Sequence, residues 1–232
     1  MGQIVMAASA AMLEYLAEAY RLAYYQPENT FVSTSALAEV MGVSAPAVTR
    51  MVQRLKKAGY LEHEPYRGIS LTSAGEHAAL MNIRRHRLVE CFLVDVMRFG
   101  WHEVHDEADD LTVALSEVII DRMDEMAEFP RRCPHGEPIP SKSGTMPRVI
   151  DRPLNEAATG SQIVLSRVHT HDTDKLEYLG QLGLRPGRKF HLIDRAPFNG
   201  PLQLSLNGGV QHIGHELAGV LRVCDEGEFE LS

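Results

Sequence analysis

The sequence predicts a mainly α-helical protein with a small β domain at its C-terminal end. Two helical stretches around a tight turn, followed by two short extended runs, occupy residues 1–74. Helical periodicity continues through residues 75–130, and β-type runs between Gly and Pro turns fill residues 159–232. Residues 131–158 are rich in Pro, Ser and Gly, which predicts a linker. We therefore expect three folded domains and one linker.

The first domain has the pattern of a winged helix-turn-helix. Gly42 marks the tight turn between two helices, and Gly59 is a favourable C-cap for the second of them. The Pro-Tyr-Arg-Gly run at 65–68 is typical of a hairpin tip, which would form the wing. The elements expected here are helices over 7–25, 33–41 and 46–58 and strands over 60–64 and 68–72.

The two following domains are expected to differ in secondary structure. The second should hold two long helices, over about 72–99 and 104–127. In the last domain, the density of short β-type runs predicts a small barrel or sandwich. These runs cover 162–168, 189–193, 203–206 and 220–223.

Charge is unevenly distributed along a chain whose net charge is −8. Between Ser44 and Glu90, eight basic and four acidic residues give +4. Between Glu103 and Glu128, ten acidic residues accompany one basic residue, Arg122. This distribution favours a nucleic-acid surface followed by a cation site, and the alternative is two solvated helix faces.

The helix-turn-helix pattern predicts which residues contact DNA. The second helix enters the major groove with its N-terminal residues, while the wing contacts the backbone. Small residues at that leading edge allow apolar contact with thymine methyl groups. The residues expected there are Ser44, Ala45, Pro46, Ala47, Thr49 and Arg50, of which Arg50 could reach a base or a phosphate. Phosphate contacts are expected from Arg54, Lys57 and Arg67.

Cysteine usage and hydropathy limit the compartment. Cys91, Cys133 and Cys224 are too few and too scattered for a disulfide framework or a CxxC zinc site. No apolar run approaches the roughly 20 residues needed to cross a bilayer, and the N-terminus lacks the features of a signal peptide. We therefore expect a cytoplasmic protein without a membrane partner.

Two histidine–carboxylate pairs stand at helical spacing. His86 and Glu90 are four residues apart, as are His105 and Asp109, so each pair shares one helix face. A lone histidine on a helix is usually a surface or core residue. Two such pairs beside an acidic helix instead predict a site for a divalent cation.

Several runs resemble one protein family over nearly the whole chain. SALAEVMGVSAPAVTRMVQRLKKAGYLEHEPYRGISLTSAG resembles the DNA-binding domain of the diphtheria-toxin-repressor family, above all its manganese-regulator branch. RRHRLVECFL, followed by VHDEADD, is similar to the family's dimerisation and metal-binding domain, CPHGEPIP to its linker, and the last third to its FeoA-type, SH3-like barrel. The resemblance implies a homodimeric repressor of metal-homeostasis genes that binds a two-fold operator when loaded with Mn(II) or Fe(II).

The resemblance also implies a set of metal ligands. The family's motifs match at His86, Glu90 and His105. Asp109 stands where the iron branch has cysteine and the manganese branch glutamate, and Glu14 stands where they have methionine and aspartate. Oxygen ligands in place of sulfur favour Mn(II), although Fe(II) accepts the same set.

Three positions depart from the family's pattern. Thr112 and Val113 replace a glutamate and a histidine, and Ala17 replaces a carboxylate of the manganese branch. One of the family's two usual metal positions is therefore depleted, with Glu107 or its acidic neighbours as candidate substitutes. Further candidates, in the segment from which the family's barrel supplies ligands, are His169 and His171.

Two other classes of function are alternatives to this one. The run from His102 to His105 is superficially similar to a zinc-protease motif, but its histidines are three residues apart rather than four. We therefore do not expect an enzyme. The alternative that remains is a winged-helix repressor that responds to a small organic effector without metal, and the histidine pairs count against it.

Overall fold

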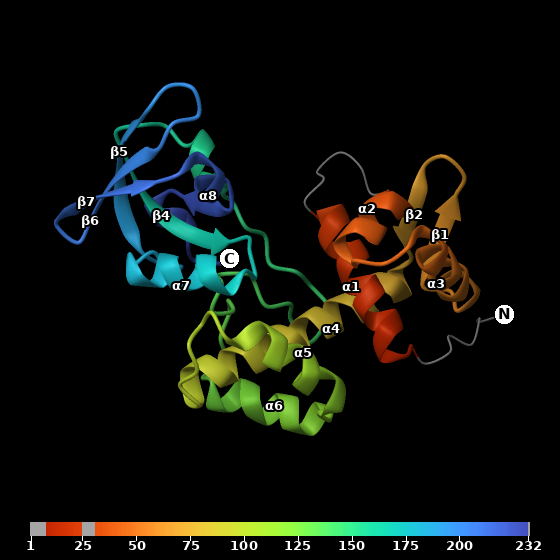
Figure 1. The fold of residues 1–232 in the computed structure, drawn as a ribbon. Coiled ribbons are helices and arrows are strands. Elements are labelled where there is room, and N and C mark those ends of the chain that lie inside the picture. Colours follow the sequence, from red (N-terminus) through yellow and green to blue (C-terminus); the bar gives the residue numbers. More distant parts are fainter. Residues whose placement is uncertain (1–7, 25–30, 232) are drawn as a thin grey trace. The chain divides into compact units, whose positions relative to one another are not determined.

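The computed structural model describes residues 8–24 and 31–231, so residues 1–7, 25–30 and 232 lie outside the description, including both ends of the first predicted helix. The chain forms two compact units (Figure 1). We call residues 1–85 with 140–145 the N-terminal unit, and residues 86–139 with 146–232 the C-terminal unit. Among the described residues, no helix combines the length and apolarity that crossing a bilayer requires.

The N-terminal unit confirms the predicted winged helix-turn-helix. Three helices are followed by an antiparallel hairpin, and a long fourth helix starts directly after the hairpin. The elements are α1 (Ala10–Tyr24), α2 (Thr34–Val40), α3 (Ala45–Lys57), β1 (Leu61–Glu64), β2 (Gly68–Leu71) and α4 (Ser73–Cys91), whose residues from His86 onward belong to the C-terminal unit.

Local sequence signals explain where the two helices of the motif begin. The hydroxyl of Ser33 accepts a hydrogen bond from the amide of Ala36 at 3.0 Å and caps α2. Pro46 lies in the first turn of α3, where its missing amide hydrogen leaves no bond unmade. Ser44 occupies the N-cap position of α3 with extended backbone, but its side chain makes no capping hydrogen bond. The α3 start therefore depends on proline and backbone conformation rather than on a cap.

Apolar residues at helical spacing form the core of this unit. Leu16 of α1, Leu37 of α2 and Leu55 of α3 are at most 1% exposed. The wing joins the same core, because Ile69 of β2 exchanges two backbone hydrogen bonds with Val32, at 2.8 and 2.9 Å. The packing buries one face of α3 and leaves its polar face exposed.

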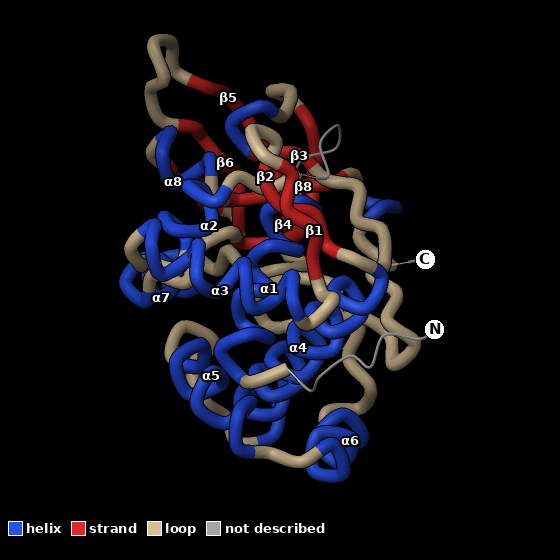
Figure 2. The backbone as a smooth tube through the Cα atoms, turned by 90° about the vertical axis from the view of Figure 1, so that its right-hand side faces the viewer, coloured by secondary structure: helices blue, strands red, loops and turns tan. Residues whose placement is uncertain are grey.

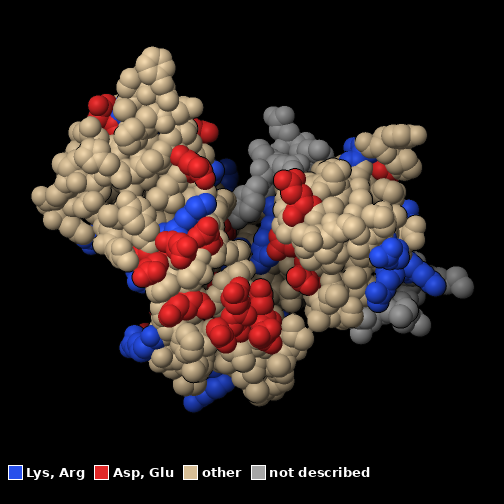
Figure 3. Space-filling model, in the orientation of Figure 1, with Lys and Arg blue, Asp and Glu red and all other residues tan. Residues whose placement is uncertain are grey.

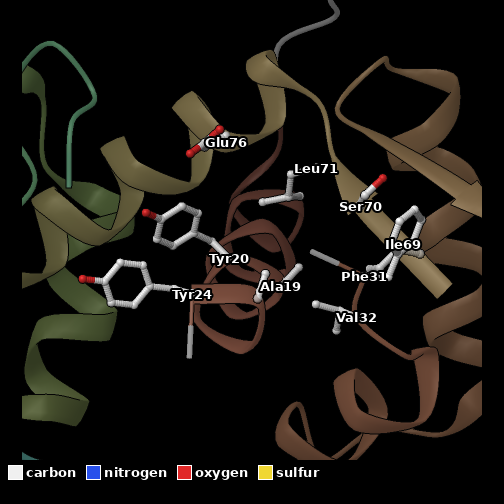
Figure 4. A pocket seen from close by; sticks show the side chains of 10 residues that line it. Ala19, Tyr20, Tyr24, Phe31, Val32, Ile69, Ser70, Leu71 and Glu76 are labelled. Carbon is white, nitrogen blue, oxygen red and sulfur yellow. The ribbon is translucent and has the colours of Figure 1, made fainter. Parts of the chain in front are cut away.

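A cavity of about 480 Å³ opens beside α1 in the N-terminal unit (Figure 4). Its lining is mostly apolar and includes the stacked rings of Tyr20 and Tyr24, whose centroids are 5.8 Å apart. Glu76 is the one charged residue among the described residues that line it, and these include no histidine or cysteine. This cavity therefore lacks the donor set of a transition-metal site.

The helical part of the C-terminal unit differs from the prediction in two places. The helix expected over 72–99 ends as an α-helix at Cys91, and Phe92–Val96 continue it as a π-helical turn. The single helix expected over 104–127 is wrong, since α5 (Val104–Ala114) and α6 (Glu117–Met126) are separate elements.

The break between α5 and α6 has a local cause. Leu115 and Ser116 both adopt extended backbone, with ψ of 146° and 159°. Serine favours the N-cap position, and the carbonyl oxygen of Ser116 accepts the amides of Ile119 and Ile120 to start α6. Helical periodicity runs through this point in the sequence, which is why the break was not predicted.

The rest of the C-terminal unit is a six-stranded antiparallel sheet, which confirms the predicted small β domain (Figure 2). The strand order is β3-β8-β4-β5-β6-β7, and bulges in the β4–β8 and β5–β6 pairs increase its curvature. Ile163, Leu192 and Leu204 form its core together with Trp101 from the helical part. The elements are β3 (Arg152–Pro153), β4 (Ser161–Val168), α7 (Thr173–Gln181), β5 (Lys189–Arg195), β6 (Leu202–Leu206), β7 (Gly209–Ile213), α8 (His215–Gly219) and β8 (Leu221–Cys224).

Residues 131–139, at the start of the segment expected as a linker, pack into the C-terminal unit. Cys133 and His135 are both buried, and the amide of Cys133 donates to the carbonyl oxygen of Glu137 at 2.8 Å. Gly136 makes this turn possible, because its φ is +87° and a Cβ there would lie 2.2 Å from a backbone oxygen of β4. The turn places a thiol and an imidazole in the interior of this unit.

The close approach of the wing to the Val32 segment gives a first prediction. Gly68 has φ of +116°, and a Cβ there would lie 2.3 Å from the Val32 carbonyl oxygen. Gly42 also has positive φ, +61°, but nothing lies within 4 Å of its Cβ position. Gly42→Ala should cost about 1–2 kcal/mol of unfolding free energy, and Gly68→Ala about 3 kcal/mol or more, because strain and overlap add. Urea unfolding followed by circular dichroism measures both, and equal losses would contradict the close approach.

Candidate metal centre

A buried carboxylate on α4 forms the middle of the candidate site. Glu90 and His86 lie one helical turn apart, and their side chains are 3% and 8% exposed. Taking a carboxylate out of water is costly unless charged or hydrogen-bonding partners compensate it. The residues around Glu90 therefore indicate what compensates its charge.

Two histidines from different helices approach the same oxygen of Glu90. Nε2 of His86 lies 3.2 Å from Oε1 of Glu90, and Nδ1 of His105, on α5, lies 3.3 Å from it. The two nitrogens are 3.2 Å from each other. Two nitrogens and one oxygen thus form a small triangle, with its corners supplied by α4 and α5.

The turn at 133–137 brings a third histidine to this oxygen and a thiol next to that histidine. Nδ1 of His135 lies 3.4 Å from Oε1 of Glu90, and Sγ of Cys133 lies 3.9 Å from that nitrogen. Glu90 therefore belongs to two groups of potential metal ligands, one with His86 and His105 and one with Cys133 and His135.

The outer nitrogens of two of these histidines are engaged elsewhere. Nε2 of His135 lies 2.8 Å from the carbonyl oxygen of Trp101, and Nδ1 of His86 lies 3.1 Å from Oδ1 of Asp109. These oxygens can only accept, so both outer nitrogens carry a hydrogen. A neutral imidazole carries a single N–H, which leaves a lone pair on each inner nitrogen, facing Glu90.

This arrangement fits a cation better than it fits an empty interior. Neutral His86 and His135 present lone pairs to Glu90, so of these three histidines His105 alone can donate to the buried carboxylate while neutral, through Nδ1. A single neutral N–H compensates a buried charge poorly, so the negative charge of Glu90 needs a positive partner. Either protons bind to the inner nitrogens or a metal ion takes their place. Imidazole, carboxylate and thiolate are together the ligands of divalent transition metals. The residues of this chain therefore fit a divalent transition-metal ion.

Proton affinities follow from this crowding. Burial alone would raise the pKa of Glu90, but His86, followed by His105 and His135, holds it well below the ordinary value. Burial would lower the pKa of His135, yet Cys133 and Glu90 raise it to about 11. Burial and the charge of Glu90 raise the pKa of the Cys133 thiol. In the absence of a cation, protons therefore occupy His135 and Cys133 at neutral pH.

The remaining predicted ligands are distributed over several elements. His171 stacks on His105, with ring centroids 3.6 Å apart, and His169 pairs with Glu137 at 2.9 Å. Glu107 is exposed on α5, and Glu14 is exposed on α1 of the N-terminal unit. Cys133 and His135 were not predicted, although the Cys-Pro-His run was a usable signal.

A half-buried carboxylate, that of Glu137, contacts the segments that carry the candidate ligands. Glu137 lies 3.2 Å from Nη2 of Arg87 on α4, 3.3 Å from Nη1 of Arg167 on β4, and 2.9 Å from Nε2 of His169 beyond β4. Burial would raise its pKa, but His169 and the two guanidinium groups hold it well below its ordinary value. Glu137 thus joins α4, the 133–137 turn and the sheet by charge-assisted contacts.

The predicted DNA-contacting residues form an exposed surface of the N-terminal unit. Lys and Arg side chains gather over α3 in Figure 3, whereas Asp and Glu side chains gather over α5 of the C-terminal unit. Arg67 of the wing pairs with Glu64 at 2.7 Å and lies 3.9 Å above the ring of Phe31. The exposed members are Ser44, Ala45, Pro46, Thr49, Arg50, Arg54, Lys57 and Arg67, and Ala47 is half-buried.

Comparison with known proteins decides the family. The model of the iron dependent repressor N-terminal DNA binding domain matches residues 8–69, and that of the metal binding and dimerisation domain matches residues 72–141. The FeoA domain matches residues 152–223. A solved manganese-dependent transcriptional repressor in complex with manganese is 32% identical, with a TM-score of 0.82, over 92% of this chain and 99% of that one. The chain belongs to the diphtheria toxin repressor family.

Other relatives agree with this family of metal-dependent transcriptional repressors. The manganese regulator SloR is 28% identical, with a TM-score of 0.72, over 95% of this chain and 100% of that one. The diphtheria toxin repressor of Corynebacterium glutamicum is 28% identical over 221 residues, which is 90% of this chain and 93% of that protein. The solved relatives place the chain in the manganese-regulator branch of the family.

Two of the three positions that depart from the family's pattern lie on α5, close to Asp109, and the third, Ala17, is buried on α1. Thr112 is buried, and the side chain of Val113 is 67% exposed. Valine has no donor atom, so a ligand set built around Asp109 would lack one of its members. The intact group of family positions is the one around Glu90.

The Glu137 contacts predict a stability difference. Glu137→Gln keeps the volume but removes the charge, leaving Arg87 and Arg167 undercompensated, and should cost about 3–5 kcal/mol of unfolding free energy. The control is Glu125→Gln, in an exposed pair with Arg122, which should cost less than about 1 kcal/mol. Because the folded-state pKa of Glu137 lies below its ordinary 4.5, the gap between wild type and Glu137→Gln should be full above pH 4.5 and shrink below it. Equal losses in both variants at neutral pH would contradict this role.

The protonated state of the centre predicts proton release on metal binding. A cation must displace the protons that His135 and Cys133 hold at neutral pH, so its apparent affinity should rise with pH. Calorimetric titration of Mn(II) into the chain, in two buffers that differ in ionisation enthalpy, measures the number released. An apparent enthalpy independent of the buffer would mean that no proton leaves.

Proposed function

We propose that this chain is a homodimeric repressor of metal-homeostasis genes that binds operator DNA when Mn(II) or Fe(II) occupies the centre around Glu90. The observation that carries the proposal is the convergence of three imidazole nitrogens on one buried carboxylate oxygen, with a thiol beside one of them. The family adds the regulatory role, and the exposed basic face of α3 adds the DNA surface. The function proposed is regulatory rather than catalytic, and it is exercised in the cytoplasm, where operator DNA lies.

His86, Glu90 and His105 are the residues that we propose to hold the cation, with Cys133 and His135 completing the set around Glu90. Two histidines and one carboxylate are the donor set of many Fe(II) sites, and carboxylate oxygen also accepts Mn(II). Among solved relatives, one repressor is described with manganese, and ScaR with Cd²⁺ or Zn²⁺. Metal selection in this chain is then a matter of geometry and availability as much as of affinity.

The DNA surface that we propose combines α3 and the wing. The leading edge of α3, Ser44 to Arg50, would lie in the major groove, and small side chains there allow close approach. Arg54 and Lys57, later on the same helix, would contact phosphates, as would Arg67 on the wing. Phosphate contacts position the protein, and the leading edge supplies sequence preference.

A homodimer explains an exposed apolar surface on the two helices that follow α4. Val113, Val118, Ile119 and Met126 on α5 and α6 are between 45% and 79% exposed. Large apolar side chains exposed on consecutive helices favour an interaction surface. We propose that a second copy of this chain covers them, so that two α3 helices can bind successive major grooves, about 34 Å apart.

The cation would act by its differential affinity for the dimer geometry that fits the operator. A cation bound between α4, α5 and the 133–137 turn fixes these segments relative to one another. Because α4 starts directly after the wing, a change in the position of α4 would move the DNA-binding helices. Metal binding and DNA binding are then reciprocally coupled.

Operator binding with and without metal tests the proposal. Duplexes are first selected from random DNA with the Mn(II)-loaded chain, and their affinity is then measured by fluorescence anisotropy at fixed salt. Mn(II) or Fe(II) should tighten binding at least about fivefold, the lower end of typical coupling. His86→Ala should abolish this response, whereas His212→Ala, which removes an exposed histidine of β7, should leave it unchanged.

Two results would contradict the proposal. The first is equal affinity with and without cation in the wild-type chain, which would favour the small-molecule alternative. The second is a full metal response in His86→Ala, which would move the cation away from Glu90. Calorimetry on His86→Ala separates these results, since it measures metal binding without DNA.

A further inference from the structure

Asp109 lies on the outer side of the histidine cluster, away from the buried carboxylate. Its Oδ1 is 3.1 Å from Nδ1 of His86, and its Oδ2 is 4.0 Å from Nε2 of His105. The inner nitrogens, Nε2 of His86 and Nδ1 of His105, are the ones that meet Glu90. Asp109 therefore faces the outer nitrogens of His86 and His105, and Glu90 faces their inner nitrogens.

Burial separates the two carboxylates as clearly as position does. The side chain of Asp109 is 63% exposed, whereas that of Glu90 is 3% exposed. The two nitrogens of an imidazole point in different directions. A cation bound to Nε2 of His86 is therefore on the other side of the ring from Asp109, which lies at Nδ1. Asp109 is placed to hold the ring and not the ion.

A separate cation at Asp109 is poorly supported by its own helix. The side chains one turn further along α5 belong to Thr112, which is buried, and Val113, which has no donor atom. A transition-metal site needs several convergent donors, and neither of the two groups of potential ligands found among the described residues includes Asp109. The 3.1 Å contact with Nδ1 of His86 instead accounts for the placement of Asp109.

We infer that Asp109 is a positioning residue, which fixes the tautomer and orientation of His86 from outside the cation site and does not contact the cation. The inference rests on the metal centre proposed above. A carboxylate that accepts the outer N–H of a ligating histidine makes the inner nitrogen the more basic one and fixes the ring's direction. At the corresponding position, the family resemblance implies a ligand, so this chain uses the position differently.

Metal affinity and cobalt absorption test this role without DNA. Asp109→Ala should weaken Co(II) and Mn(II) binding about 10–100-fold, the usual effect of losing an outer partner of a ligating histidine. Asp109→Asn keeps an acceptor oxygen for the N–H of His86 and should lose less. The control is Glu125→Ala, which removes one exposed carboxylate from α6 and should leave affinity unchanged.

A cysteine at position 109 reports directly on contact with the ion. A thiolate bound to Co(II) gives a sulfur-to-metal charge-transfer absorption in the near ultraviolet, and Cys133→Ser removes the thiol nearest Glu90. In the double variant Cys133→Ser/Asp109→Cys, bound Co(II) should show no such band. Appearance of the band would mean that position 109 coordinates the ion and would overturn the inference.

The outcomes also separate this inference from the proposed centre. If His86→Ala abolishes Co(II) binding while Asp109→Ala binds like wild type, the centre stands and the positioning role fails. If His86→Ala binds Co(II) like wild type, the centre itself is wrong. A loss in Asp109→Ala equal to that in Asp109→Asn, together with the charge-transfer band, would identify Asp109 as a ligand.

Discussion

The charge of Glu90 is the constraint around which the C-terminal unit is arranged. A carboxylate with 3% of its side chain exposed needs positive partners, and three imidazoles from α4, α5 and the 133–137 turn surround one of its oxygens. None of these segments can move without changing how that charge is compensated. At the proposed centre, a cation would compensate this charge in place of protons, which would give the unit two states. Sensing follows from electrostatics before any DNA is involved.

Two of the histidines have outer partners of different kinds. The outer nitrogen of His135 contacts the carbonyl oxygen of Trp101, whose side chain packs in the core of the sheet. The outer nitrogen of His86 contacts the exposed carboxylate of Asp109. The same kind of ring is therefore oriented in one case by a rigid core and in the other by a solvated carboxylate. Asp109, the exposed partner, can therefore be substituted to change the orientation of His86 without disturbing the fold.

Much of the fold follows from the sequence because its signals are local. The two helices around Gly42, the hairpin after Gly59 and the pairing of His86 with Glu90 at four-residue spacing each depend on a few neighbouring residues. The split between α5 and α6 could not be foreseen, since apolar periodicity continues through Leu115 and Ser116. Nor could the burial of Cys133 and His135, which depends on contacts between segments far apart in the chain. Glu14, on α1, is still a prediction.

Glu137 has a consequence for how such proteins can be recombined. Glu137 lies in the 133–137 turn and contacts Arg87 on α4, Arg167 on β4 and His169 just after β4. A chimera that exchanges the FeoA domain for one from a relative would bring in new partners for this carboxylate. Arg87 and Glu137 would then be inherited from one parent and Arg167 and His169 from the other. Exchange of the FeoA domain is therefore limited by the need to match these charges. We expect α4, the 133–137 turn and β4 to function together only when they come from the same parent.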